Sequence, residues 1–141
     1  NQPQATRNAI SDDHWFRTGD VGYFDEQGFY YICDRVKDMI ISGGENVYPA
    51  EVESVLYAHP AVAEVAVIGA PDPQWGEAVV AVVALKPGSS LTLDEMREFT
   101  GERLARYKVP KQLRIVEALP RNPTGKILKY KLRGQPSDPI V

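Results

Sequence analysis

The segment from Asp34 to Glu53 constrains the fold of this chain more than any other, because residues that shape the backbone follow one another without a spacer. It reads DRVKDMIISGGENVYPAEVE. Pro49 has a fixed φ that the first turn of a helix accepts, and Glu51 lies where the positive end of a helix favours acids. We therefore expect a short helix over residues 49–57. The preceding Ser42–Gly44 triplet indicates a tight turn with positive φ, a surface that a ligand approaches closely, or both.

Strand-like runs lie on both sides of this segment. Aromatic and β-branched residues flank the sequence DEQG, which predicts a β-hairpin over residues 21–33. The runs 62–68 and 79–85 predict two more strands, and the second, a continuous run of valine and alanine, is expected to be buried on both faces. The turn residues 71–73, Pro-Asp-Pro, lie between the two runs, so we expect the strands to pair antiparallel.

A surface helix is predicted in the C-terminal half. Thr92 and Glu95 have the spacing of a capping box, in which each side chain accepts a hydrogen bond from the other residue's backbone N–H. The helix that they begin is expected to include Leu104, and Pro110 blocks its continuation.

The last elements complete an α+β pattern. Residues 111–116 alternate, which predicts a strand with one solvated face and with Leu113 and Ile115 on the other. A basic turn is expected at residues 130–133. Helices mixed with short strands, without an internal repeat, predict a small α+β domain whose short central sheet is flanked by helices.

The N-terminal residues suggest a fragment. The chain has no initiator methionine, residues 1–13 contain few apolar side chains, and no secretory or membrane-spanning segment is visible. We expect a piece that begins inside a larger soluble protein. The single cysteine, Cys33, excludes an internal disulfide framework and a zinc cluster and fits a reducing compartment, with the cytoplasm as the default.

The charge is distributed unevenly along the chain. Residues 103–133 carry ten basic side chains and one acid, Glu117, whereas residues 11–102 carry seventeen acids and five bases. This asymmetry predicts an anionic partner for the C-terminal end. Nucleic acid is the first candidate, because aromatic residues are interleaved with the basic ones. The alternative is a solvated basic face.

Several site classes are excluded by what the sequence lacks. The two histidines have no metal-ligand spacing, and no Gly-x-Ser-x-Gly motif is present, so a metal site or a hydrolase triad is not expected. The sequence NPTGK is not a phosphate-binding P-loop, because Ile127 stands where that motif requires serine or threonine. What remains is Lys126 on a Pro-Thr-Gly loop that could aim a long cation.

Five motifs together resemble the C-terminal region of the adenylate-forming enzymes, in the same order and spacing. They are FRTGD at 16–20, DRVKD at 34–38, SGGENVYPAEVE at 42–53, PDPQWGE at 71–77 and PRNPTGK at 120–126. The resemblance covers residues 15–133, and five collinear motifs are far more specific than one. The motif GENVYP is more similar to the corresponding motif of acyl-CoA synthetases, especially bacterial fatty acid–CoA ligases, than to that of nonribosomal peptide adenylation domains.

The resemblance implies two nucleotide-binding residues. Asp20 corresponds to the carboxylate that accepts hydrogen bonds from both ribose hydroxyls of ATP, and Arg35 to an arginine that contacts the ribose. Taken alone, Asp20 would be a turn or helix-capping acid, and Arg35 a surface ion-pair partner of Asp34 or Asp38.

It also implies a catalytic lysine and a moving domain. Lys126 corresponds to the lysine that reaches the carboxylate and the α-phosphate during adenylation, and it binds ATP or AMP there. Lys37 falls at the hinge about which the small domain turns between the two half-reactions. Ser42, Gly43 and Gly44 would then line the approach of the pantetheine thiol of coenzyme A, where a missing Cβ leaves room.

The implied domain order is a β-hairpin remnant of a large N-terminal domain over 1–34, a hinge over 35–38, a mobile lid domain over 39–134 and a tail over 135–141. The resemblance also implies a carboxylic acid, ATP and coenzyme A as ligands of the whole enzyme, with Mg²⁺ held mainly by the large domain.

We interpret Trp75 and Glu77 as fold residues. No nucleic acid is expected on this reading, and a peripheral contact with a membrane stays open.

Two other functions remain as alternatives. The chain could belong to an adenylation domain that loads a carrier protein, which uses the same pantetheine thiol. It could also be a standalone basic module that binds nucleic acid or another anion. On the favoured interpretation the fragment alone is inactive, because no phosphate-holding Pro-Lys-Gly loop and no acyl pocket are present in it.

Overall fold

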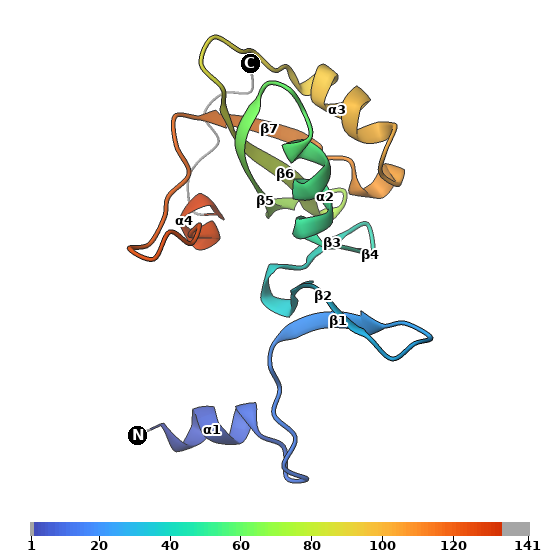
Figure 1. The fold of residues 1–141 in the computed structure, drawn as a ribbon, viewed down its shortest axis with the longest axis vertical. Helices are drawn as coiled ribbons and strands as arrows, with labels where there is room; N and C mark the ends of the chain where they lie inside the picture. Colours follow the sequence, from blue (N-terminus) through green and yellow to red (C-terminus); the bar gives the residue numbers. More distant parts are fainter. Residues whose placement is uncertain (1, 134–141) are drawn as a thin grey trace. The chain divides into compact units, whose positions relative to one another are not determined.

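The computed structural model describes residues 2–133 and divides the chain into two compact units, residues 1–37 and residues 38–141 (Figure 1). Unit 1 contains α1 (Pro3–Ala9) and a hairpin of β1 (Asp20–Phe24) and β2 (Tyr30–Arg35). A short 3-10 turn, η1 (Val36–Asp38), follows the hairpin. The hairpin was predicted from the sequence, whereas α1 was not.

A carboxylate at the start of its loop shapes the β1–β2 hairpin. Asp25 accepts hydrogen bonds from the backbone N–H groups of Gln27 and Phe29 and, at 2.8 Å, from the hydroxyl of Tyr31. The bond from Phe29 is the largest cause that lowers the pKa of Asp25, and the bond from Tyr31 is the next. Because all three donors lie within six residues of Asp25, the loop is closed by local contacts.

Unit 2 is built on one mixed sheet. Within the described residues its strands are β3 (Ile40–Ser42), β4 (Glu45–Val47), β5 (Val62–Asp72), β6 (Gly76–Leu85) and β7 (Gln112–Val116). Its helices are α2 (Pro49–Tyr57), α3 (Leu93–Gly101), the 3-10 turn η2 (Arg106–Lys108) and α4 (Lys129–Arg133).

Strand β6 is the centre of this sheet. Antiparallel β5 covers one of its edges along the whole length. The other edge is shared, because β3 pairs with it only at Gly76 and parallel β7 pairs with it from Val80 to Ala84. Strand β5 is therefore an outer strand of the described sheet, and β3 joins the short β4 at the opposite side.

Both faces of the sheet are covered, as a continuous apolar strand requires. Alternate residues of β5 and β6 pack with α2 and α3 in one core cluster, in which Leu56 and Met96 are fully buried. The residues between them pack with Leu119 and Leu132, from the segment before and within α4. The prediction that the 79–85 run is buried on both faces and pairs antiparallel is confirmed for Val79 to Ala84. The α+β fold class is confirmed as well.

The turn expected around residues 71–73 is present but shifted: β5 continues to Asp72, the turn begins at Pro73, and Asp72 Oδ1 accepts from the N–H groups of Gln74 and Trp75. Two other local predictions were wrong. Helix α3 ends at Gly101, a residue of low helix propensity, so Leu104 lies beyond it and its N–H donates to Thr100 O at 2.9 Å.

The second error concerns β7. Ile115, predicted to face the core, is 48% exposed. Arg114, predicted to face solvent, is half-buried, since its guanidinium donates to the carbonyl of Leu132 in α4. The alternation was read correctly as a strand, but the helix α4 that packs near it changes which side chains are covered.

The capping box of α3 is confirmed and gives a first prediction. Thr92 Oγ1 accepts from the N–H of Glu95, and Glu95 Oε2 accepts from the N–H of Thr92 at 2.7 Å. Thr92→Ala should lower the free energy of unfolding by about 1 kcal/mol. Urea unfolding of the chain and of the control Ser90→Ala, at an exposed neighbouring position, would measure the difference. Equal stability of the two variants would contradict the capping role.

The same box has a pH dependence. The bond from the Thr92 N–H is the first cause that lowers the pKa of Glu95 below its ordinary value of 4.5. A lowered pKa means that the stabilisation is present above pH 4.5 and is lost as the pH falls through the folded-state pKa. Thr92→Ala keeps that N–H but removes the hydroxyl, which donates to Glu95 Oε2 at 2.8 Å and is the second cause of the lowered pKa. The difference in free energy of unfolding between the wild type and Thr92→Ala should therefore narrow below pH 4.5.

Candidate functional site

The two predicted nucleotide residues of unit 1 lie next to each other. Asp20 begins β1, Arg35 ends β2, and the antiparallel register places them opposite each other. Arg35 Nε lies 3.2 Å from Asp20 Oδ1, and both side chains are partly exposed. Asp38, one of the alternative ion-pair partners, pairs with Arg133 instead. The result is a carboxylate and a guanidinium presented together at the open end of a hairpin, where they can accept from and donate to vicinal hydroxyls.

The predicted hinge residue lies at the border of the units. Lys37 is exposed in η1, and the division into compact units falls directly after it. The next residue, Asp38, is held within unit 2 by an ion pair with Arg133 of α4 at 2.9 Å. A change of backbone angles at Lys37 would leave this anchor in place.

The double glycine forms the two-residue turn of the β3–β4 hairpin. Gly43 and Gly44 have φ of +63° and +85°, which matches a turn that needs positive φ at both central positions. A Cβ on Gly43 would come within 2.8 Å of the Trp75 ring, whereas a Cβ on Gly44 would meet no described atom within 4 Å. The predicted positive φ is confirmed, and Gly43 has a packing requirement in addition.

A cleft of about 1100 Å³ opens beside this turn. It is lined by Ser42, Trp75, Arg97, Gly101, Arg106, Tyr107, Val109, Pro110 and Lys111. These described lining residues include three cations, two aromatic rings and no acid. Ser42 is only 2% exposed, and its Oγ has no hydrogen-bond partner among the described residues.

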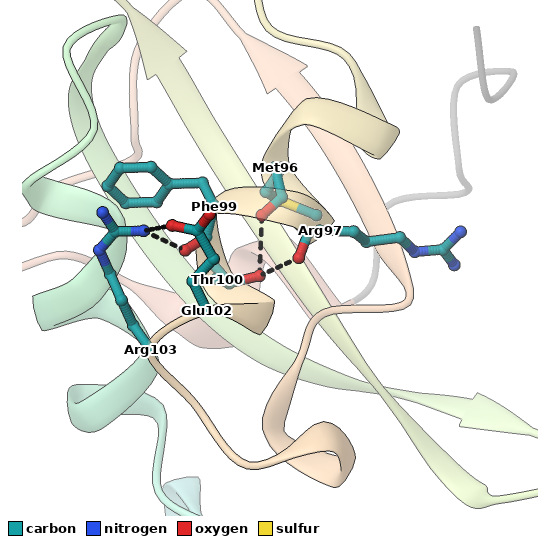
Figure 2. Close-up of polar contacts among 6 residues, drawn as sticks. All are labelled: Met96, Arg97, Phe99, Thr100, Glu102 and Arg103. Atoms are coloured by element: carbon teal, nitrogen blue, oxygen red, sulfur yellow. Dashed lines mark hydrogen bonds and ion pairs between the residues drawn. The ribbon is translucent and has the colours of Figure 1, made fainter.

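The cleft cations are held in place by neighbouring groups. Lys111 Nζ lies 4.3 Å from the centroid of the Trp75 ring. Arg97 Nη2 donates to the carbonyl of Lys111 at 2.9 Å. Figure 2 shows the side chain of Arg97 extending away from the polar contacts that Thr100 and Arg103 make on α3. A cleft of this kind suits a ligand that combines phosphate with an aromatic base.

Lys126 lies on a loop with its own hydrogen-bond network. Asn122 Oδ1 accepts from Thr124 N, Thr124 Oγ1 and Lys126 N, and Gly125 takes a φ of +85°. The Lys126 side chain is exposed, and no ion pair involves its Nζ in the part of the chain that the structure describes. The loop thus presents a cation that no neighbouring acid neutralises.

The loop and the double-glycine turn lie apart within unit 2. The segment that leads into α4 belongs to the sheet face covered by Leu119 and Leu132, whereas Ile40 and Val47 of the β3–β4 hairpin belong to the other core cluster. Figure 1 shows the orange-red loop before α4 and the teal β3–β4 hairpin separated across the width of the unit. One fixed orientation of unit 2 would not present both to the same point.

Half of the basic side chains in the C-terminal stretch form ion pairs within the described residues. Five of the ten basic side chains in 103–133 form ion pairs: Arg103, Lys108, Arg121, Lys129 and Arg133. The pair with Glu51 is the first cause that raises the pKa of Lys108. Of the other basic side chains, Arg106 and Lys111 line the cleft, and Lys126 lies exposed on its loop.

The cleft was missed from the sequence. Arg97, Arg106, Tyr107 and Lys111 were not identified as candidate site residues, and Trp75 was interpreted as a fold residue alone. Its carbonyl accepts from the Gly43 N–H at 2.9 Å, which is a fold role, and Trp75 also lines the cleft. The stretch RYKVPK, in which an aromatic residue lies among cations, was the available signal. The fold role of Glu77 is confirmed, since its Oε2 accepts from the Ile41 N–H at 2.9 Å.

Residues 51–126 match the sequence model of the AMP-binding enzyme C-terminal domain, which is more than half of the chain. The chain belongs to this family. The matched range ends at Lys126, so the AMP-binding enzyme C-terminal domain as matched contains the cleft cations and the lysine loop. Asp20, Arg35 and the double-glycine turn precede it.

Two curated relatives of this AMP-binding domain illustrate the range of similar proteins. The chain is 58% identical over 135 residues to the long-chain-fatty-acid–CoA ligase FadD13 of Mycobacterium tuberculosis, covering 96% of this chain and 26% of that protein. It is 52% identical over 132 residues to a 2-succinylbenzoate–CoA ligase of Geobacillus kaustophilus, covering 94% and 27%. The chain therefore spans about a quarter of the length of these relatives.

Solved structures give the same result. A Mycobacterium tuberculosis fatty acyl CoA synthetase matches with a TM-score of 0.71 and 57% identity over 94% of this chain and 26% of that one. The o-succinylbenzoate CoA synthetase of Bacillus subtilis, in complex with its acyl-adenylate intermediate, matches with a TM-score of 0.83 and 45% identity over 92% and 26%. The resemblance to acyl-CoA ligases of the adenylate-forming superfamily is confirmed.

The described residues contain neither a metal-binding cluster nor a membrane-spanning helix. Residues 2–133 contain no group of three or more His, Cys, Asp and Glu side chains placed to hold a metal ion. No helix in this range is both long and apolar enough to cross a membrane.

Proposed function

We propose that the protein to which this chain belongs is an AMP-forming acyl-CoA ligase that activates a carboxylic acid, and more narrowly a fatty acid. In the first half-reaction a carboxylate oxygen of the acid attacks the α-phosphorus of ATP, and pyrophosphate leaves. In the second, the sulfur of coenzyme A attacks the acyl carbon, the thiol proton is lost, and AMP leaves. The carboxylic acid, ATP and coenzyme A are substrates on this proposal.

The residues of this chain would divide between the two half-reactions. Asp20 and Arg35 hold the ribose of the nucleotide, and Lys126 stabilises the charge that builds on the carboxylate and α-phosphate oxygens. The separation of the Lys126 loop from the Gly43–Gly44 turn supports a reorientation of unit 2 about Lys37 between the two steps.

The cleft is the observation that carries the coenzyme A part of the proposal. Coenzyme A combines an adenine ring, three phosphate groups and a long pantetheine arm. Trp75 and Tyr107 can stack on the adenine, while Arg106 and Lys111 can bind the phosphates. Ser42 lines the cleft and directly precedes the Gly43–Gly44 turn, so a nucleotide in the cleft would direct its pantetheine arm toward the glycines.

The described residues do not form a Mg²⁺ site, because they lack a carboxylate cluster. We assign the metal to the ATP phosphates and to the large domain, and no step of this chain depends on it. The closer similarity to the fatty acid ligase, 58% against 52% identity, supports a fatty acid as the substrate. Rates with a panel of fatty acids and with 2-succinylbenzoate would decide between the two acids.

A substitution in the cleft tests the coenzyme A site. Lys111→Met keeps an unbranched side chain but removes the ammonium group that lies over Trp75, so the KM for coenzyme A should rise about tenfold, the effect of losing one charged hydrogen bond. The rate of acyl-adenylate formation should not change. The control Lys131→Met removes an exposed lysine of α4 outside the cleft and should leave both quantities unchanged.

Dephospho-coenzyme A, which lacks the 3′-phosphate, sharpens this test. If Lys111 binds that phosphate, the substitution should raise the KM for coenzyme A and leave the KM for dephospho-coenzyme A nearly unchanged. An equal rise with both compounds would assign Lys111 to the diphosphate instead. An unchanged KM for both would exclude the cleft as the coenzyme A site.

The acyl acceptor tests the alternative function. If the enzyme transferred its acyl group to a carrier protein and not to coenzyme A, the chain would belong to a carrier-loading adenylation domain.

A further inference from the structure

Ion pairs tie the loop that carries Lys126 to strand β5 at its start and to helix α2 at its end. At its start, Arg121 Nη2 lies 2.7 Å from Glu64 Oε1 of β5. At its end, Lys129 Nζ lies 2.7 Å from Glu53 Oε1. Glu53 Oε1 in turn accepts from the N–H of Val67 in β5 at 2.7 Å. One ion pair therefore holds the loop to β5 directly, and the other holds it to α2, whose Glu53 is hydrogen-bonded to β5.

Arg121 makes a second contact at the reactive end of the loop. Its Nη1 donates to the carbonyl oxygen of Gly125 at 2.6 Å. That carbonyl and the N–H of Lys126 belong to the same peptide group, and the N–H donates to Asn122 Oδ1 at 2.8 Å. The peptide before Lys126 is thus held on both sides, while the side chain beyond it is exposed.

These contacts are poorly suited to a role in stability. The side chains of Arg121 and Glu64 are 41% and 34% exposed, and ion pairs this open contribute little to folding. Holding a backbone position is a different effect, because a small misplacement of a reacting group costs a large factor in rate. The guanidinium suits this task, since its planar fork donates in two directions at once.

We propose that Arg121 is a positioning residue for the adenylation half-reaction. It joins Glu64 of β5 to the Gly125 carbonyl and thereby fixes the backbone from which Lys126 reaches the nucleotide. The inference rests on the proposed function of Lys126. It assigns to Arg121 no contact with the substrate and no part in thioester formation.

The test uses the complete ligase, in which this chain is joined to the large domain that its relatives carry. Arg121→Met should lower the kcat of acyl-adenylate formation about tenfold or more and leave the KM for ATP nearly unchanged. Thioester formation from a supplied acyl-adenylate should keep its rate, and the melting temperature should stay within about 2 °C of the wild type.

The chain offers a closely matched control. Arg103 likewise donates to a carbonyl four residues away, that of Phe99 at 2.7 Å, and pairs with Glu102 at 2.9 Å, as Figure 2 shows. Arg103→Met removes the same kinds of contact at the end of α3 and should leave the adenylation rate unchanged. A comparable loss from both arginines would mean that a general structural effect is measured, and the proposal would fail.

A conservative variant separates charge from geometry. Arg121→Lys can keep the ion pair with Glu64, but a single ammonium cannot span Glu64 and the Gly125 carbonyl in the same way. Adenylation should stay at least severalfold below the wild type. Full activity of this variant, or equal losses in both half-reactions of Arg121→Met, would overturn the positioning role. If the wild-type ligase itself formed no acyl-adenylate, the proposed function would fail instead.

Discussion

Lys126→Ala should abolish acyl-adenylate formation in the complete ligase, with a rate loss on the order of 10²- to 10³-fold, the usual effect of removing one transition-state donor. The physical reason is that its Nζ is a cation on an otherwise well-ordered loop and pairs with no acid in the described chain. ATP–pyrophosphate exchange would measure the adenylation step. Thioester formation from a supplied acyl-adenylate should be spared, because Lys126 is then turned away from the reacting atoms.

The control for Lys126→Ala is Lys86→Ala, which removes another exposed lysine, in the turn after β6, and should leave both half-reactions unchanged. Equal loss of adenylation and thioester formation in Lys126→Ala would contradict the division of labour between the loop and the glycine turn. It would instead indicate that Lys126 acts on binding common to both steps.

Gly44→Leu should have the opposite effect, blocking thioester formation while adenylation continues. Within the described chain a Cβ at Gly44 meets no atom within 4 Å, so the leucine has room and points outward from the turn. In the thioester-forming orientation the same side chain would occupy the path of the pantetheine arm. We expect a loss of about 10²-fold in the rate of thioester formation, measured from isolated acyl-adenylate.

The strain of the substitution itself requires a control. Gly44 has φ of +85°, so any side chain there costs roughly 1–2 kcal/mol of folding free energy. Gly88 is matched to it, with φ of +76° and no described atom within 4 Å of an added Cβ, but it lies after β6 and away from the cleft. Gly88→Leu should lose similar stability and keep both activities. A Gly44→Leu enzyme with a normal thioester rate would leave only the turn role for this glycine.

The sequence predicts those parts of the fold that local patterns determine. The capping box at Thr92, the proline at the start of α2 and the apolar run of β6 each depend on residues within a few positions of one another. The exposed face of β7 was wrong for the opposite reason, because a contact between Arg114 and the carbonyl of Leu132, 18 residues away, overrides the local alternation. The end of α3 was a misread local signal, since the helix ends at Gly101, a residue of low helix propensity.

The residues of the candidate site likewise differ in whether local sequence patterns predict them. Asp20, Arg35, the double glycine and Lys126 were identifiable because each lies in a compact motif. The cleft was not, because it is assembled from segments around residues 42, 75, 97–101 and 106–111. The ion pair that holds the Lys126 loop to β5 also joins distant positions, since Arg121 and Glu64 are 57 residues apart. No periodicity or spacing rule connects such residues, and only the packed sheet brings them together.

The long-range ion pairs of unit 2 have a consequence for the chain as it is synthesised. A nascent chain that ends at residue 102 has seventeen acids against five bases from residue 11 onward. At that point the basic partners of four acids have not yet been synthesised; the acids are Asp38, Glu51, Glu53 and Glu64. Strand β6 also lacks β7, so one edge of a very apolar strand stays open to other chains. We expect translation arrest or truncation in this region to yield aggregates, because both the compensating charge and strand β7 lie between residues 103 and 133.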